Sequence, residues 1–153
     1  MIDMETMQLL GSAVQAARGG DDARAEALIC VKLAERNVDT LGTAVSSEEM
    51  MDFLGNAAAV YEGIGMLDVA AQRMTRLCQL AEQGAPDTVE TAGDYSRLAL
   101  LLEKHGDVDD ALMALERSAE HLRGAGAYER YASGYESFFA RLRGAASQST
   151  GAD

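Results

Sequence analysis

The chain has 153 residues, of which 48% are hydrophobic, with one proline, no tryptophan and a net charge of −12. This length suits one domain or one short array of repeats, and the composition, thin in β-branched residues, favours helices nearly throughout. The negative charge is spread along the chain and repels phosphate backbones and anionic lipids, so we expect no nucleic-acid or membrane partner.

Two helices are predicted in the first hairpin, over residues 3–18 and 23–37, with a break at Gly19-Gly20 and a connection over residues 38–45. Helical spacing predicts an apolar face in each of them. The residues expected to face the core are Met4, Met7, Leu10 and Val14 in the first helix and Ala25, Leu28, Ile29 and Leu33 in the second.

Ser46 and Glu49 have the spacing of a capping box, which predicts the start of a third helix that reaches Ile64. Gly65 ends it, and a fourth helix follows over residues 67–83. The expected inward side chains are Met50, Phe53, Leu54, Ala57, Ala58 and Tyr61 in the third helix and Ala70, Met74, Leu77, Cys78 and Ala81 in the fourth.

Residues 88–123 predict a third pair of helices, interrupted by His105-Gly106-Asp107, with Asp107 placed to cap the sixth helix. A last helix is expected over residues 128–143, and residues 144–153 are small and polar and are expected to be disordered. This last helix holds five of the eight aromatic residues: Tyr128, Tyr131, Tyr135, Phe138 and Phe139.

The three predicted hairpins share a pattern of small residues around their turns. Gly20, Gly65 and Gly106 are each followed five residues later by an alanine and preceded seven residues earlier by another. The alanines are Ala25, Ala70 and Ala111 after the glycines and Ala13, Ala58 and Ala99 before them. Small side chains at these positions allow helices to approach closely, and glycine ends the first helix of each pair without a Cβ penalty.

On these residues the chain resembles the tetratricopeptide repeat superfamily. The third unit matches best, through Tyr95, Leu98, Ala99, Leu102, Gly106, Ala111, Leu115 and Ser118. The repeat spacings of 45 and 41 residues exceed the usual 34 and are similar to the longer kinesin-light-chain type.

The resemblance implies an all-α, TPR-like α-solenoid of three antiparallel helix hairpins plus a C-terminal capping helix. The expected repeats cover about residues 4–37, 47–83 and 88–123, the capping helix covers 128–143, and together they form one domain over residues 1–143. An irregular helical bundle is the alternative.

The resemblance also implies a concave groove, lined by the first helix of each pair, that binds a peptide or helical segment of another protein. Carried onto this sequence, the groove residues are Val14, Arg18, Ala59, Glu62, Ser96, Leu100, Glu103 and Lys104, with Leu10, Ala17, Gly55 and Gly63 beside them. This set is mostly small and apolar, which suits an apolar segment.

Catalytic and metal-binding patterns are not found in the sequence. His105 and His121 are both expected to be exposed, and the calcium-loop start at Asp107 is followed by Ala111 and Leu112 where a ligand and a glycine are needed. Cys30 and Cys78 form no CxxC motif and are expected to be buried, reduced thiols. We therefore expect no enzyme activity, metal or cofactor.

The leading hypothesis is a non-enzymatic scaffold for protein–protein interaction. We expect it to be cytoplasmic, because the N-terminus lacks a signal-peptide pattern. A small secretion-type chaperone is one alternative. The other is a structural homo-oligomer, such as a homodimer, assembled through the aromatic last helix. That helix is expected to act either as a cap on the last hairpin or as an interface.

Overall fold

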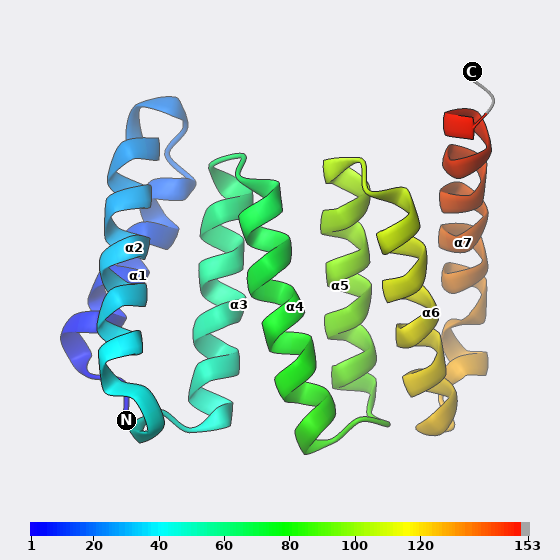
Figure 1. The fold of residues 1–153 in the computed structure, drawn as a ribbon, viewed down its shortest axis with the longest axis horizontal. Helices are drawn as coiled ribbons and strands as arrows, with labels where there is room; N and C mark the ends of the chain where they lie inside the picture. The colour runs from blue at the N-terminus through cyan, green and yellow to red at the C-terminus, as the bar shows by residue number, and fades with distance from the viewer. Residues whose placement is uncertain (151–153) are drawn as a thin grey trace. The chain divides into compact units, whose positions relative to one another are not determined.

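The computed structural model describes residues 1–150, with side chains described through residue 148, and this part of the chain is all-helical, without a strand. Two short 3₁₀ helices, η1 (Asp21–Ala23) and η2 (Gly42–Ala44), flank the second α-helix. The α-helices are α1 (Met4–Ala17), α2 (Arg24–Leu41), α3 (Ser47–Gly63), α4 (Leu67–Gly84), α5 (Val89–His105), α6 (Val108–Gly124) and α7 (Tyr128–Thr150) (Figure 1).

The chain divides into two compact units, and the division falls within α4, after Leu77. Unit 1 contains α1, α2, α3 and the first part of α4, and unit 2 contains the end of α4 with α5, α6 and α7. The sequence predicted one continuous domain over residues 1–143. Among the described residues, no helix is both long and apolar enough to cross a membrane.

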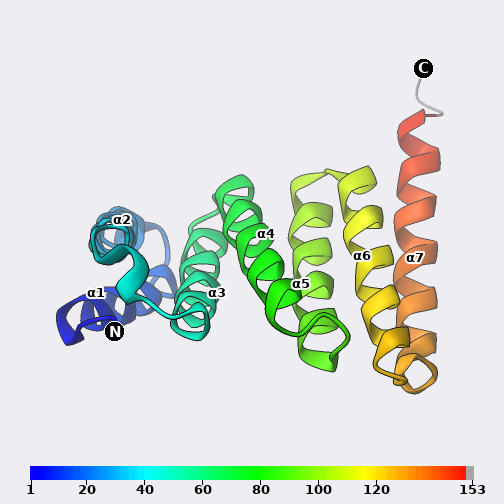
Figure 2. The ribbon, with the colours of Figure 1, turned by 60° about the horizontal axis from the view of Figure 1, so that its bottom comes forward.

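In unit 1, α1 packs against α2 and α3, and α2 also contacts α3 (Figure 2). The predicted apolar faces of the first two helices are largely wrong, because Met4, Met7, Ile29 and Leu33 are exposed. The helices bury their smaller side chains instead, which allows close packing. The buried residues are Thr6, Leu10, Ala13 and Ala16 in α1 and Ala27, Val31, Ala34 and Val38 in α2.

The 3₁₀ turn η1 explains part of this difference. It delays the start of α2 to Arg24 and leaves Ala25 exposed, so Ala27 takes the buried position near the turn. The other five alanines of the repeat pattern are fully buried, at Ala13, Ala58, Ala70, Ala99 and Ala111. The helix α2 also runs past the predicted end at Asn37, because Val38 continues its buried face.

The turns follow the predicted chemistry, with one exception. The backbone N–H of Glu49 donates to Ser46 Oγ at 3.1 Å, and together the two residues form the predicted capping box. Gly106 has φ +94°, the left-handed conformation that favours glycine. The prediction for Asp107 is wrong, because its side chain caps no backbone N–H and lies 4.0 Å from His105 Nε2.

In unit 2, α5 packs against α6, and α6 packs against α7 (Figure 1). The face of α7 toward this core carries Phe139 and Leu142, which are 8% and 0% exposed. The predicted disorder of residues 144–153 is wrong for residues 144–150, which continue α7, and residues 151–153 lie outside the described part. Ala145 and Ala146 are good helix formers and are half-buried, so they carry the helix past Gly144.

The two cysteines differ in their surroundings. Cys78 is fully buried, and burial raises the pKa of its thiol to about 12. Cys30 is only partly buried, so the expectation of two buried thiols holds for Cys78 alone.

Candidate functional site

A small cleft in unit 2 is lined by side chains of α5, α6 and α7, and we call it the aromatic cleft. Its volume is about 240 Å³. Most of its wall is aromatic or aliphatic, and three of the lining side chains are rings from α7. The lining residues are Ser96, Leu115, Tyr131, Gly134, Tyr135 and Phe138.

Hydroxyl groups fix the position of α7 beside this cleft. Ser118 is fully buried and donates its proton to the carbonyl oxygen of Ala92 at 2.5 Å. Ser118 Oγ must therefore accept from Tyr135 Oη, which lies 2.6 Å away. Ser96 Oγ lies 3.1 Å from the same tyrosine oxygen. The hydroxyl of Tyr135 thus joins α7 to both α5 and α6.

An ion pair joins α7 to α5 near the C-terminal end of α5. Arg141 donates from Nε to Glu103 Oε2 at 2.6 Å and from Nη2 to Oε1 at 3.0 Å. The guanidinium of Arg141 also lies over the ring of Phe138, 4.5 Å from its centroid. This bidentate pair positions the Phe138 ring at the edge of the aromatic cleft.

The aromatic cleft joins two sets of residues that the sequence predicted as separate surfaces. The predicted groove residues Ser96 and Glu103 contact the α7 residues Tyr135 and Arg141. Leu100 lies one helical turn beyond Ser96 and is 43% exposed. The last predicted groove residue of unit 2, Lys104, is exposed at the end of α5.

The aromatic residues of α7 divide between packing and exposure. Phe139 is buried, and the guanidinium of Arg143 lies over its ring. Tyr128 is half-buried under Arg123 and packs near Tyr135, with ring centroids 5.6 Å apart. Tyr131 is 41% exposed at the aromatic cleft. The helix therefore packs on α6 with one face and presents aromatic side chains along an edge.

The predicted groove residues of unit 1 lie on the solvent side of α1 and α3. Arg18 and Ala59 are exposed, and Val14 and Glu62 are half-buried. Beside them the two helices approach closely at Gly63, where an added Cβ would lie 3.1 Å from the Cβ of Ala17.

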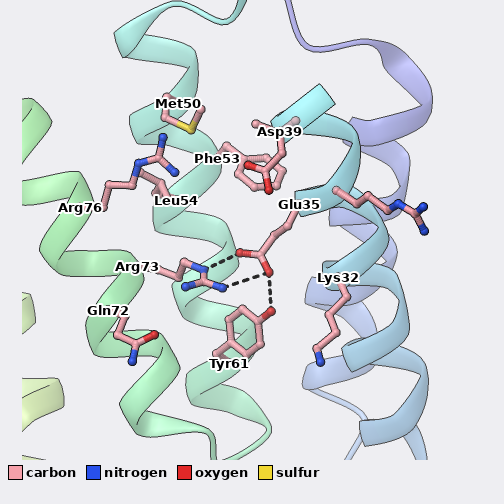
Figure 3. Close-up of a pocket in the computed structure, with 12 residues that line it drawn as sticks. Lys32, Glu35, Asp39, Met50, Phe53, Leu54, Tyr61, Gln72, Arg73 and Arg76 are labelled. Atoms are coloured by element: carbon pink, nitrogen blue, oxygen red, sulfur yellow. Dashed lines mark hydrogen bonds and ion pairs between the residues drawn. The ribbon is translucent and has the colours of Figure 1, made fainter. Parts of the chain in front are cut away.

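A larger cavity of about 510 Å³ lies in unit 1, between α2, α3 and α4. Figure 3 shows Tyr61 and Arg73 pointing toward Glu35 within it. Tyr61 Oη donates to Glu35 Oε1, and Arg73 Nε donates to Glu35 Oε2 at 2.5 Å. Burial, with the carboxylate of Glu35, raises the pKa of Tyr61 to about 12, so the hydroxyl stays protonated and donates.

The same three residue types form a second cluster in unit 2. Glu82, at the end of α4, accepts from Arg117 of α6. The hydrogen bond from Arg117 is the main cause that lowers the pKa of Glu82 to about 2, and the interaction of the Glu82 carboxylate with Tyr95 of α5 contributes to this lowering. We call the two sets, Glu35–Tyr61–Arg73 and Glu82–Tyr95–Arg117, the carboxylate clamps.

Each clamp ties three successive helices together through one carboxylate. In each, the arginine also lies over the tyrosine ring, at 5.4 Å in unit 1 and 5.8 Å in unit 2. Sequence reasoning did not single out Glu35, Arg73, Glu82 or Arg117. No fixed spacing could have found them, because Glu35 precedes Tyr61 by 26 residues whereas Glu82 precedes Tyr95 by 13.

His121 extends the clamp of unit 2, and its side chain is only 13% exposed, contrary to the expected exposure. Its Nε2 lies 2.8 Å from Glu82 Oε1, and its Nδ1 lies 3.2 Å from Asp87 Oδ1. Burial lowers the pKa of His121, but the hydrogen bonds to these two carboxylates outweigh it and raise the pKa above its usual value.

Among the described residues, no group of three or more His, Cys, Asp or Glu side chains is placed to hold a metal ion. A comparison with models of known protein families finds no match, and a comparison with curated proteins also finds none.

Proposed function

We propose that this chain is a non-enzymatic protein-interaction scaffold of the tetratricopeptide type, which binds an apolar peptide or helical segment at the aromatic cleft. The contacts within each unit support a stack of hairpins. In unit 1, α3 packs on both helices of the preceding hairpin. In unit 2, α7 is bonded to both α5 and α6 through Tyr135. In each unit a carboxylate clamp also joins helices of neighbouring hairpins.

The aromatic cleft is the observation that carries the proposal. Cavities that enclose drug-sized ligands have volumes of about 300–1,000 Å³, so 240 Å³ suits one anchoring side chain better than a whole small molecule. Tyr131 exposes apolar surface within this cavity, and Leu100 does so one helical turn from Ser96, which lines it. Interfaces obtain most of their affinity from such anchors, which insert into preformed pockets near aromatic side chains.

The proposed groove extends along the exposed faces of the first helices. In unit 2 this exposed face includes Leu100 and Lys104. The predicted groove residues of unit 1, Val14, Arg18, Ala59 and Glu62, form a surface of that unit by itself. Such grooves recognise a partner by shape and a few apolar contacts, so the reaction chemistry of an enzyme is not required.

A peptide-display selection on the full chain tests this proposal. We expect a random peptide library to yield binders with a large apolar residue, and we expect Leu100→Glu or Tyr131→Ser to weaken them about tenfold or more. Met113→Glu is the matched control, because Met113 is 66% exposed on α6 and belongs neither to the aromatic cleft nor to the proposed groove beside it. Circular dichroism checks that all three variants keep their helices.

The proposal fails if the selection yields no binders, or if Met113→Glu weakens them as much as Leu100→Glu. Light scattering on the same proteins separates the alternative. A dimer that Tyr131→Ser converts to a folded monomer would show that the exposed edge of α7 serves self-assembly.

A further inference from the structure

The cavity of unit 1 is lined by one lysine and three arginines although the protein is acidic, and we call it the basic cleft. Residues 1–77 contain six lysines and arginines, and all except Arg18 and Arg24 line this cavity. Only Glu35 and Asp39 contribute carboxylates to it. The cleft is therefore locally cationic in a chain whose net charge is −12.

Most of this positive charge has no partner among the described residues. Arg73 is paired with Glu35 in the carboxylate clamp, so the charges of these two residues offset each other. The side chains of Lys32, Arg36 and Arg76 are exposed, and none makes a hydrogen bond or ion pair with another described residue. Asp39 is the one remaining carboxylate against these three cations.

The cleft also has an apolar wall. Met50, Phe53 and Leu54 of α3 line it, and Figure 3 shows Arg76 extending toward Met50 and Leu54. Lys32 lies on the opposite side, on α2. A ligand in this position would meet cations from two helices and the half-buried side chain of Met50, behind which Phe53 and Leu54 are buried.

We propose that the basic cleft is a binding site for an acidic peptide segment that carries at least one large apolar residue. Its carboxylates would pair with Arg76, Lys32 and Arg36, and arginine can hold a carboxylate with two parallel hydrogen bonds. Its apolar side chain would pack against Met50. The volume of about 510 Å³ is sufficient for two or three side chains.

The chemistry of the cleft favours a short acidic peptide over a long polyanion. At physiological salt the Debye length is about 8 Å, so a short ligand responds mainly to the cations next to it. A nucleic acid would extend beyond the cleft and meet the acidic surface of the chain. This inference does not rest on the aromatic cleft, whose lining carries no charged residue.

Fluorescence anisotropy with a labelled synthetic peptide tests the proposal on the full chain. The probe contains only glutamate and aspartate apart from one phenylalanine and one leucine. We expect saturable binding by the unmodified protein, and Arg76→Glu should raise Kd about tenfold or more, as expected for loss and reversal of one charged contact. Arg130→Glu makes the same charge change on an exposed arginine of α7 and should alter Kd less than about twofold.

Three results would overturn the proposal. The first is the absence of saturable binding, and the second is equal weakening by Arg76→Glu and Arg130→Glu, which indicates general charge attraction. The third is unchanged affinity when serine replaces both apolar residues of the probe, because the apolar wall would then take no part. Leu100→Glu should leave this binding unchanged, so failure here is distinguishable from failure of the aromatic cleft.

Discussion

Single residues determine how closely the helices approach at their turns. Ala111 is fully buried where α6 begins, and a larger side chain there has no space. We expect Ala111→Leu to lower the free energy of unfolding by about 1–3 kcal/mol through overpacking. Urea unfolding followed by circular dichroism measures this change.

The chain contains a matched control for this substitution. Ala25 has the same position after its turn glycine, but it is exposed, because η1 delays the start of α2. Ala25→Leu should therefore change the free energy of unfolding by less than about 0.5 kcal/mol. Equal losses in the two variants would show that packing at the turn is not the cause.

At the scale of the helices, periodicity and turn chemistry predicted the main elements. The Ser46–Glu49 capping box is confirmed, and so is a break at each turn glycine. The prediction of the core face of α2 was wrong because the helix has apolar residues on two faces, and the face with the larger side chains was predicted to be buried. Packing favours the stripe that contains Ala27 and Ala34, since smaller residues allow a closer approach to α1.

The candidate sites were less predictable than the helices. The aromatic cleft brings Ser96 of α5 together with Tyr131 and Phe138 of α7. Ser96 was predicted as part of the groove, and the two aromatic residues were predicted as part of a separate face. The basic cleft was missed altogether. Lys32 and Arg76 lie 44 residues apart in the sequence and share a cavity only because α2 and α4 both flank α3. Local patterns contain no information on such pairings.

The junction of α4, α5 and α6 is expected to weaken as the pH rises. The pKa of His121 is raised in the folded state by Glu82 and Asp87, so folding favours its protonated form. This contribution to stability is complete below the unfolded pKa of about 6.5 and is lost as the pH rises through the folded pKa. Glu82, with a pKa of about 2, stays ionised throughout this range.

We expect His121→Gln to remove this pH dependence. The difference in free energy of unfolding between the unmodified protein and the variant should be largest near pH 6 and should shrink toward pH 8. Urea titrations at several pH values measure it. His105→Gln is the control, because the side chain of His105 is 43% exposed. A difference that stays constant with pH would contradict the proposed role of His121.

At the scale of the whole molecule, the aromatic cleft and the basic cleft lie in different units and differ in chemistry. The aromatic cleft of unit 2 has an uncharged lining, and the basic cleft of unit 1 combines an apolar wall with cations that have no partner in the described part of the chain. The two would select different ligands, and one chain could then hold two partners. In unit 1 the carboxylate clamp joins the helices that line the basic cleft, and in unit 2 the hydroxyl of Tyr135 and the Arg141–Glu103 pair join the helices around the aromatic cleft.

The net charge of −12 predicts how salt acts on the folded protein, because both units carry an excess of acids. The attractive pairs that join helices, such as Arg117–Glu82 and Arg141–Glu103, are partly exposed, and such pairs contribute only about 0–1 kcal/mol each. Repulsion between the remaining acids should therefore dominate the response to screening. We expect the melting temperature at pH 7 to rise by a few degrees, about 2–5 °C, between roughly 0.01 M and 0.15 M NaCl.

Thermal unfolding followed by circular dichroism measures this shift, and the isoelectric point supplies the control. At pH 4.5 the chain is close to neutral, so the same increase in salt should leave the melting temperature nearly unchanged. A fall in melting temperature at pH 7 would mean that the arginine–carboxylate pairs contribute more than the repulsion between acids. The carboxylate clamps would then be the main electrostatic determinant of stability, and Glu35→Gln and Glu82→Gln should each abolish part of the fall.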